Sequence, residues 1–441
     1  MLKHFGTDGV RGVALITLTV KMAYRIGRSL GRMAFLDQKP VLVCEDTRLS
    51  GETLKGALID GLLKSGAVVY DSAVSTTPSV SYLVKAKRFA YGVMISASHN
   101  PYGDNGIKVF NGEGEKLADD REGIIEEYMD READDLPLAP GRLVSGDGLK
   151  EEYLAWLASK AQGGYGKARV LVDCANGSAS ALAPRLYEKL GVDAFFINAA
   201  PNGRNINDDC GSTHLEGLRK AYLEKGCDLG FAFDGDGDRF MAFGPGGRLI
   251  DGDALVFLGA LYLREKKALK NDTVVITVMS NFGLRKALEE EGIAYKTVAV
   301  GDKNVQQALK KDGLSLGGEQ SGHVIFLDDL NTGDGLLSSL KLLDIFVHEP
   351  ALYRKIAEFA VYPQILKNVP FATREALEKA ANDPALRDFV ARQEASLKGQ
   401  GRVLVRPSGT EPLLRVMAEA SDEGKCAKAV EEIVSFIKGD R

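Results

Sequence analysis

Short apolar runs alternate with longer amphipathic stretches through the first 110 residues of the chain. Residues 40–44, 68–70 and 91–94 are apolar runs of the length of buried strands. Before and between them, apolar residues recur at helical spacing over residues 20–33 and 54–63. Because helices connect strands that run in the same direction in such a pattern, we expect a parallel α/β module.

The same alternation returns in the middle of the chain. Strands over 168–173 and 228–233, with a helix over 181–190 between them, indicate a second module. A third module is expected from about residue 253. Its predicted elements are a helix over 253–263, a strand over 273–278, a helix over 282–288, a strand over 295–300 and a helix over 335–346.

The C-terminal part has a different pattern. Two amphipathic helices are followed by strands over 402–405 and 413–417 and by a final helix to Ile437. A polar stretch with two prolines and several glycines, residues 134–148, is the first predicted boundary. We therefore expect an α/β protein of four domains around a central cleft: three similar α/β modules over 1–148, 149–252 and 253–360, and a smaller C-terminal α+β domain over 361–441.

The composition is that of a folded protein, since 45% of the 441 residues are hydrophobic and 27% are charged. A net charge of −5 argues against a dedicated nucleic-acid surface. The five cysteines are odd in number and dispersed, which is typical of a reduced compartment rather than of a disulfide framework or a zinc site. No apolar run approaches the ~20 residues that span a bilayer, and no signal peptide opens the chain, so we expect a cytoplasmic location.

Ser98 is the first candidate for chemistry. It follows the apolar run 91–94, so its hydroxyl should lie at the carboxyl end of a strand, where ligands collect in open α/β sheets. His99 is adjacent, and a glycine-containing turn follows over residues 102–106. A serine in this setting is a candidate nucleophile or phosphate carrier. The alternative is a polar loop that ends at a proline.

A carboxylate triplet is the most specific chemical signal. The strand over 228–233 leads directly into Asp234-Gly235-Asp236-Gly237-Asp238-Arg239. Carboxylates two residues apart on an extended segment can point the same way, and such hard oxygen ligands favour Mg²⁺ or Ca²⁺. An EF-hand is excluded, because Arg239 and Pro245 occupy the positions that require Gly and Glu. The triplet therefore predicts a metal site.

Three further loops suit a sugar phosphate. Residues 6–12 are rich in glycine and include Arg11, which can approach an anion, although a tight structural turn is the alternative. Residues 406–412 offer an arginine, two hydroxyls and a glycine N–H, with Arg415 on the next strand; they suit a phosphate, and a hairpin turn is the alternative. Residues 316–326 gather Glu, Gln, Ser and His, which suit sugar hydroxyls but also occur in solvated turns.

Together these segments indicate an enzyme that moves phosphate on a sugar phosphate. Phosphoryl transfer needs little covalent help from the protein. It needs a divalent cation, positive groups around the moving phosphoryl group, and fixed geometry. A carrier serine, a carboxylate triplet, a sugar-binding loop and two phosphate-binding loops would supply these.

Eight segments, in this order, resemble the signature motifs of the α-D-phosphohexomutase superfamily. They are GTDGVRG (6–12), SASHNP (96–101), DNGIK (104–108), CGSTH (210–214), FDGDGDR (233–239), GGEQSGH (317–323), NTGDGLL (331–337) and RPSGTEP (406–412). The resemblance covers essentially the whole chain. The CGSTH and GEQSGH segments are similar to the glucosamine branch of the superfamily.

The resemblance implies interconversion of glucosamine 6-phosphate and glucosamine 1-phosphate, on the route to UDP-N-acetylglucosamine. It implies a phosphoserine enzyme, one Mg²⁺ per active site, and glucosamine 1,6-bisphosphate as intermediate and activator. The alternatives are a phosphomannomutase/phosphoglucomutase of the same superfamily, a Mg²⁺-dependent sugar phosphatase and a non-catalytic sugar-phosphate sensor. The expected partner is a small-molecule sugar phosphate, with no nucleic acid and no membrane, and a homodimer is a further expectation.

The resemblance also implies roles for individual residues. They are, for catalysis, Ser98, Lys108, Arg11 and His323; for the metal, Ser98, Asp234, Asp236 and Asp238; for the sugar, Glu319 and Ser321; for the non-reacting phosphate, Arg406, Ser408, Gly409, Thr410 and Arg415; and elsewhere in the active site, His99 and Arg239. Lys108 would handle the proton, with His323 as the alternative. A lysine base needs a lowered pKa to work near neutral pH.

The chain departs from the family pattern in three loops. Residues 44–48 read CEDTR where the family usually has Gly-Arg before the Asp, and residues 75–78 read STTP in place of a Pro-Thr-Pro segment. Residues 301–305 read GDKNV in place of Gly-Asp-Arg-Tyr-Val. None of these changes removes a residue with an implied catalytic role. The third lies on a loop that is expected to face the sugar.

Overall fold

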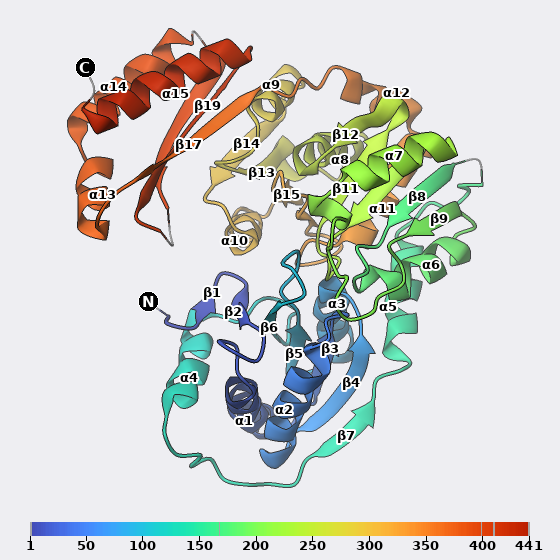
Figure 1. The fold of residues 1–441 in the computed structure, drawn as a ribbon. Coiled ribbons are helices and arrows are strands. Elements are labelled where there is room, and N and C mark those ends of the chain that lie inside the picture. The colour runs from blue at the N-terminus through green and yellow to red at the C-terminus, as the bar shows by residue number, and fades with distance from the viewer. Residues whose placement is uncertain (1, 167, 398, 409–410, 440–441) are drawn as a thin grey trace. The chain divides into compact units, whose positions relative to one another are not determined.

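The computed structural model describes residues 2–166, 168–397, 399–408 and 411–439 (Figure 1). The chain forms two compact units. The first comprises Met1–Met279 and Ile293–Ile356, and the second comprises Ser280–Gly292 and Ala357–Arg441. Within the described residues, no helix is both long enough and apolar enough to cross a membrane.

The first sheet has the strand order β1-β2-β6-β5-β3-β4-β7. Its strands are β1 (Phe5–Gly6), β2 (Gly9–Val13), β3 (Val41–Glu45), β4 (Val68–Val74), β5 (Tyr91–Ile95), β6 (Asp104–Asn111) and β7 (Arg142–Ser145). The predicted parallel pairing holds for β3, β4 and β5. Strand β7, which lies within the predicted boundary stretch 134–148, extends the parallel part beside β4. Strand β6 is antiparallel to β5, because the connection over residues 96–103 is too short for a crossover.

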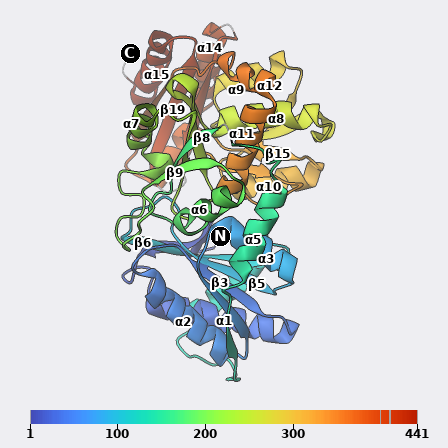
Figure 2. The ribbon, with the colours of Figure 1, turned by 90° about the vertical axis from the view of Figure 1, so that its right-hand side faces the viewer.

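Helices cover both faces of this sheet. α1 (Val20–Asp37) and α2 (Gly51–Lys64) lie on one face and α3 (Thr77–Lys87) on the other (Figure 2), and α4 (Asp119–Asp130) packs beside α1. The connections from β3 to β4 and from β4 to β5 run in opposite directions, and right-handed crossovers then require helices on opposite faces. The carboxyl ends of β3 and β5 consequently form a crevice of the kind that binds ligands.

The second sheet has the order β12-β11-β10-β8-β9. Its strands are β8 (Arg169–Asp173), β9 (Asp193–Ile197), β10 (Leu229–Phe233), β11 (Phe240–Gly244) and β12 (Arg248–Ile250), with α5 (Leu149–Ser159), α6 (Ala179–Lys189) and α7 (Glu216–Lys225). β10 is parallel to β8 and antiparallel to β11. The carboxylate triplet therefore occupies the hairpin at the carboxyl end of β10.

The third sheet has the order β14-β13-β15-β16. Its strands are β13 (Thr273–Thr277), β14 (Ala294–Val298), β15 (Leu316–Gly318) and β16 (Val324–Phe326), with α8 (Gly252–Glu265), α10 (Asp302–Asp312), α11 (Gly335–His348) and α12 (Pro350–Arg354). The apolar α8 and α11 are buried along most of their length. The antiparallel β15–β16 hairpin carries the predicted sugar loop.

The second unit is built on the antiparallel sheet β17-β19-β18. Its elements are α9 (Phe282–Glu290), β17 (Gln364–Pro370), α13 (Arg374–Ala381), α14 (Pro384–Ser396), β18 (Gly401–Pro407), β19 (Leu413–Ala420) and α15 (Glu423–Lys438). The expected fold class, three α/β modules and a smaller C-terminal domain, is confirmed. Helix α9 lies within the range predicted for the third module, and its contacts group it with the second unit, where the backbone N–H of Phe282 donates to the buried carboxylate of Glu419 at 3.0 Å.

Helices α1 and α2 pack at backbone distance. A Cβ at Gly61 would lie 2.2 Å from the carbonyl oxygen of Tyr24 on α1, so only glycine allows this approach. Around the contact, Ile26, Leu58 and Leu62 are fully buried in the core of the first module. The helix pair thereby fixes the layer beneath β3 and β5.

We expect Gly61→Ala to lower the free energy of unfolding by about 1–3 kcal/mol, because overpacking a tight contact costs that much. Gly56→Ala is the control on the same helix, because no atom lies within 4 Å of its added Cβ. It should raise the free energy of unfolding by about 0.5–1 kcal/mol, since Ala loses less backbone entropy than Gly in a helix. Equilibrium denaturation measures both. Equal effects of the two substitutions would contradict the close helix contact.

Candidate active site

Ser98 lies at the carboxyl end of β5, in the crevice beside β3. The residue is 1% exposed, and its Oγ donates a hydrogen bond to Oδ2 of Asp234 at 2.6 Å. Nδ1 of His99 lies 3.4 Å from the same Oγ. Burial, followed by Arg239 and Arg11, lowers the pKa of His99 to about 4, so its imidazole is neutral at neutral pH. The predicted carrier serine thus directly contacts the predicted metal loop.

The three carboxylates of the β10–β11 hairpin converge. One oxygen from each of Asp234, Asp236 and Asp238 lies within 4.8 Å of the others, and all three residues are buried. The hairpin touches the serine loop, since a Cβ at Gly235 would come 2.5 Å from the carbonyl oxygen of Ser98. The spacing of two residues predicted this convergence, and the glycine between the carboxylates allows the contact.

This cluster fits a divalent cation. Oδ1 of Asp236 and Oδ1 of Asp238 are buried and have no hydrogen-bond partner among the residues that the structure describes. Burial, and then the charges of Asp238 and Asp236, raise the pKa of Asp234 well above its usual range. Carboxylate oxygens without partners in a buried cluster need a cation, and hard oxygen ligands suit Mg²⁺. Among the described residues, this is the one group of three or more His, Cys, Asp or Glu side chains whose potential ligand atoms lie close enough together to hold a metal ion.

Lys108 projects from the middle of β6 into the same cluster. Its Nζ lies 2.7 Å from Asp236, 3.0 Å from Asp8 and 3.5 Å from Asp238. Burial by itself lowers the pKa of Lys108, but the three carboxylates outweigh it and raise that pKa. The role of Lys108 in handling the proton stays a prediction, but its three carboxylate contacts favour the ammonium form. Sequence alone could not show this, because it depends on carboxylates from two other loops.

Asp8 links Lys108 to two more cations. It pairs with Arg11 of the same loop and, at 2.6 Å, with Lys116. Burial raises the pKa of Asp8, but Lys108, Lys116 and Arg11 together hold it well below the usual range. The glycine-rich loop therefore does more than form a turn: its Asp8 and Arg11 both belong to the charge network around the carboxylates.

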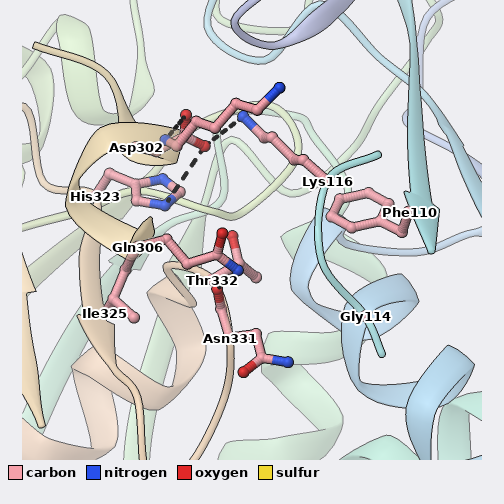
Figure 3. Close-up of a pocket in the computed structure, with 10 residues that line it drawn as sticks. Phe110, Gly114, Lys116, Asp302, Gln306, His323, Ile325, Asn331 and Thr332 are labelled. Carbon is pink, nitrogen blue, oxygen red and sulfur yellow. Dashed lines mark hydrogen bonds and ion pairs between the residues drawn. The ribbon is translucent and has the colours of Figure 1, made fainter. Parts of the chain in front are cut away.

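His323 and Asp302 connect this network to the third module. Figure 3 shows Asp302, at the start of α10, between Lys116 and His323, with both of which it interacts. Nε2 of His323 accepts the backbone N–H of Gly333 at 2.9 Å, so the proton of a neutral ring is on Nδ1, which lies 3.7 Å from Asp238. Burial lowers the pKa of His323, but the contacts with Asp238 and Asp302 raise it overall.

A cavity of about 590 Å³, called here the main cavity, opens beside these groups. It brings together three predicted segments, the glycine-rich loop with Arg11, the hairpin with Asp238 and Arg239, and the sugar loop. From the sugar loop it is lined by Glu319, Ser321 and His323. Oε1 of Glu319 accepts the backbone N–H of Gly301 at 2.9 Å, which fixes the direction of that side chain. The size suits a hexose phosphate.

The departure at residues 301–305 has a structural explanation. Gly301 and Asp302 line the main cavity, but Lys303 does not. Its Nζ reaches Oδ1 of Asp119 at 2.5 Å and Glu122 at 3.8 Å. The loop thus lines the main cavity through Gly301 and Asp302, whereas the charge of Lys303 is used in a contact with the first module.

The predicted phosphate loop lies in the second unit. Arg406 of β18 and Arg415 of β19 are direct cross-strand neighbours, and Nε of Arg415 is buried without a hydrogen-bond partner in the part of the chain that the structure describes. Burial and the charge of Arg415 lower the pKa of Arg406. Ser408 follows β18, and its backbone N–H donates to the carbonyl oxygen of Leu413 at 2.9 Å. Two adjacent guanidinium groups suit a phosphate. Gly409 and Thr410 lie outside the described residues.

Several residues of the site were not singled out from the sequence. Thr77, at the start of α3, donates its hydroxyl to the carboxylate of Asp236 and its backbone N–H to the carbonyl oxygen of the same residue at 2.9 Å. Lys116 carries no local pattern that would mark it, and Asp302 stands in the segment 301–305, which was noted only for its departure from the family pattern. Asp8 had a signal, because it stands in the same glycine-rich motif as Arg11.

Models of the phosphoglucomutase/phosphomannomutase family match the chain in four parts. Domain I of the family, described as alpha/beta/alpha, matches residues 2–135, domain II matches 151–247 and domain III matches 251–362. The C-terminal domain of the family matches residues 366–435. All four family domains are thus present in order.

Curated relatives match over the full length. The phosphoglucosamine mutase of Bacillus cytotoxicus is 45% identical over 100% of this chain and 99% of the relative, and that of Bacillus cereus is 44% identical over the same shares.

Solved structures match as well. A phosphoglucomutase/phosphomannomutase family protein from Burkholderia thailandensis superposes with a TM-score of 0.82 at 23% identity, covering 99% of this chain and 98% of that one. The N-acetylphosphoglucosamine mutase of Aspergillus fumigatus, solved with GlcNAc-6P and magnesium, gives a TM-score of 0.71 at 18% identity, covering 100% and 96%. These structural matches show the shared fold.

We expect Asp236→Asn to weaken Mg²⁺ binding at least about tenfold, the loss that even an outer partner of a metal ligand causes. Asp173→Asn is the matched control. Asp173 is also buried, at the carboxyl end of the neighbouring strand β8, but its carboxylate accepts the backbone N–H groups of Ala175 and Gly211. Isothermal titration of both variants with Mg²⁺ measures the difference. An unchanged affinity in Asp236→Asn would exclude the triplet as the metal site.

Proposed function

The chain belongs to the phosphoglucosamine mutases of the phosphoglucomutase/phosphomannomutase family, and we propose on that basis that it interconverts glucosamine 6-phosphate and glucosamine 1-phosphate. The observation that carries the proposal is the 2.6 Å hydrogen bond from Ser98 Oγ to Asp234, inside a cluster of carboxylates that suits a metal. Asp238 of this cluster lines the main cavity, so a phosphoryl group carried by Ser98 would be transferred to a sugar bound beside Asp238. The amino-sugar preference is supported by the names of the full-length relatives.

In the proposed reaction, Ser98 carries a phosphoryl group and transfers it to the free hydroxyl of the bound sugar phosphate. The bond from phosphorus to Ser98 Oγ breaks and a bond from phosphorus to the sugar oxygen forms. The proton of the sugar hydroxyl passes to a group of the protein, and Ser98 Oγ takes up a proton and becomes a hydroxyl again. The product of this step is glucosamine 1,6-bisphosphate. After the bisphosphate turns end for end, its other phosphate returns to Ser98, and the isomerised monophosphate leaves.

The metal site would hold Mg²⁺ through Asp234, Asp236 and Asp238, together with the phosphate on Ser98. Bound there, Mg²⁺ would neutralise charge on the phosphoryl oxygens. Lys108 and Arg11 would flank the moving group as cations. Lys108 is paired with three carboxylates, whereas His323 lines the main cavity, so we favour His323 for handling the proton and keep Lys108 as the alternative.

The remaining predicted residues would hold the parts of the substrate that do not react. Glu319 and Ser321 would bind sugar hydroxyls, with Arg239 and His99 nearby in the active site. The phosphate loop would bind the non-reacting phosphate through Arg406, Ser408, Gly409, Thr410 and Arg415. A remote phosphate of this kind supplies binding energy that orients the reacting end.

We expect purified protein with Mg²⁺ to convert glucosamine 6-phosphate into glucosamine 1-phosphate without release of inorganic phosphate. Ser98→Ala should abolish the conversion. Ser72→Ala is the control, since Ser72 is equally buried in the first module and its hydroxyl only donates to the carbonyl oxygen of Gly146. Both products can be followed by ³¹P NMR. Release of free phosphate would favour a sugar phosphatase, and conversion by Ser98→Ala would refute the carrier role.

We expect Arg406→Met to lower kcat/KM about 10–100-fold, mainly through KM, because a hydrogen bond to a charged group is worth about 1.5–3 kcal/mol. The phosphate on Ser98 should remain, as intact-protein mass spectrometry can show. Arg392→Met is the control in the same unit, because Arg392 is exposed and stacks on Phe389. If KM and kcat of Arg406→Met equal those of the control, the phosphate loop is assigned wrongly.

A further inference from the structure

The loop that carries Ser98 is folded around a buried arginine. Arg48 follows β3, and its side chain is fully buried. Its Nη2 donates to the carbonyl oxygens of Ser98 at 2.9 Å and Asn100 at 2.8 Å. Its Nη1 donates to the carbonyl oxygens of Pro101 and, at 3.0 Å, Asp104. One guanidinium group therefore fixes four carbonyls of the loop between β5 and β6.

Asp46 completes this arrangement. Its Oδ2 accepts Nε of Arg48 at 2.8 Å and the hydroxyl of Ser96 at 2.6 Å, and the Ser96 hydroxyl accepts the backbone N–H of Ser98 at 2.9 Å. All five N–H donors of the guanidinium are thus used. The buried positive charge of Arg48 is paired with Asp46, and the backbone N–H and the carbonyl oxygen of Ser98 both have hydrogen-bond partners.

Ser98 needs such support. Its φ is +53°, in the left-handed region that non-glycine residues rarely adopt, and residues there persist only when their surroundings hold them. A second donor comes from the second module, where Nδ2 of Asn207 lies 2.9 Å from the carbonyl oxygen of Ser98. Two side chains from different loops, Arg48 and Asn207, therefore donate hydrogen bonds to the same carbonyl oxygen.

We propose that Arg48, together with Asn207, positions Ser98 for phosphoryl transfer by holding its carbonyl oxygen. This inference rests on the proposed function. Both side chains donate to the backbone carbonyl oxygen of Ser98, so they act through Ser98 and not on the sugar. If the carbonyl is released, the peptide can rotate and carry Oγ away from Asp234. A displacement of about 1 Å at a reacting group can cost about 100-fold in rate.

Lysine cannot replace Arg48 in this role. An ammonium group has three donors at one point, whereas the guanidinium spreads five donors over a planar fork. Arg48→Lys would keep the charge beside Asp46 and leave several loop carbonyls without a donor. The substitution therefore tests the geometry of the fork separately from its charge.

Arg28 provides a matched control for the loss of stability. Its side chain is also fully buried in the first module. It donates to Asp134 at 3.0 Å, to the hydroxyl of Ser65 at 2.8 Å and to the carbonyl oxygen of Leu136. None of these acceptors belongs to the Ser98 loop. Arg28→Lys thus removes comparable hydrogen bonds without touching the carrier serine.

The experiment compares wild type, Arg48→Lys and Arg28→Lys in Tm, in steady-state kinetics and in single-turnover phosphorylation of Ser98 by glucosamine 1,6-bisphosphate. Both variants should lose Tm. Only Arg48→Lys should lose about 100-fold in kcat, with KM within about twofold of wild type and Ser98 phosphorylation slowed by a similar factor. A kcat of Arg48→Lys equal to that of Arg28→Lys would overturn the inference.

Asn207→Ala keeps the test decisive if Arg48→Lys does not fold. It removes one donor to the Ser98 carbonyl and should lower kcat about tenfold. Asn176→Ala is its control, because the amide of Asn176 bonds only within the second module, to Asn205, Ala200 and Cys210. Full kcat in Asn207→Ala would overturn the inference.

The wild-type result separates failure of the inference from failure of the proposed function. If wild type itself neither isomerises the sugar nor accepts phosphate on Ser98, the proposed function fails and the inference fails with it. If wild type is active and the variants are unaffected, the inference alone is refuted.

Discussion

Buried negative charge is the constraint on which the rest of the site depends. The carboxylates of Asp234, Asp236 and Asp238 are held together by one hairpin, and two of their oxygens have no hydrogen-bond partner. Such a cluster is costly unless cations surround it. The first module supplies Lys108, whose ammonium group contacts two of the three carboxylates and Asp8. A metal ion would supply the further positive charge that the carboxylates, and a phosphate on the serine, require.

The loops that meet here are positioned by sheet topology. The connection that leaves β3 runs toward β4, and the connection that leaves β5 runs toward β6 on the opposite side of the sheet. The carboxyl ends of β3 and β5 therefore form the crevice in which Ser98 lies. The hairpin after β10 approaches the same loop closely enough that only glycine fits at position 235. Lys116 and Asp302 then connect the first module to the third (Figure 3). The site is thus assembled from strand ends and loops of three sheets, each with its own core.

The sequence predicted the parts of the site that follow directly from an apolar strand. Ser98 and the Asp triplet were found in this way, because a polar motif after a buried run is a local signal. Thr77 and Arg48 were missed, since their importance comes from contacts with residues far away in the chain. Strand β17 was missed as well, because most of its residues are exposed and its pattern is weak. The raised pKa of Lys108 depends on three carboxylates that only folding brings together, and the domain boundaries at 148, 252 and 360 stay predictions.

The most direct test of phosphate transfer through Ser98 is a single-turnover experiment with radioactive phosphate on the enzyme. Protein labelled with ³²P at Ser98 is mixed with unlabelled glucosamine 6-phosphate and Mg²⁺, and the sugar phosphates are separated after one turnover. Label should leave Ser98 within that turnover and appear in the bisphosphate and the monophosphate product. Label that stays on Ser98 through many turnovers, while product accumulates, would contradict a carrier role and indicate direct migration of phosphate on the sugar.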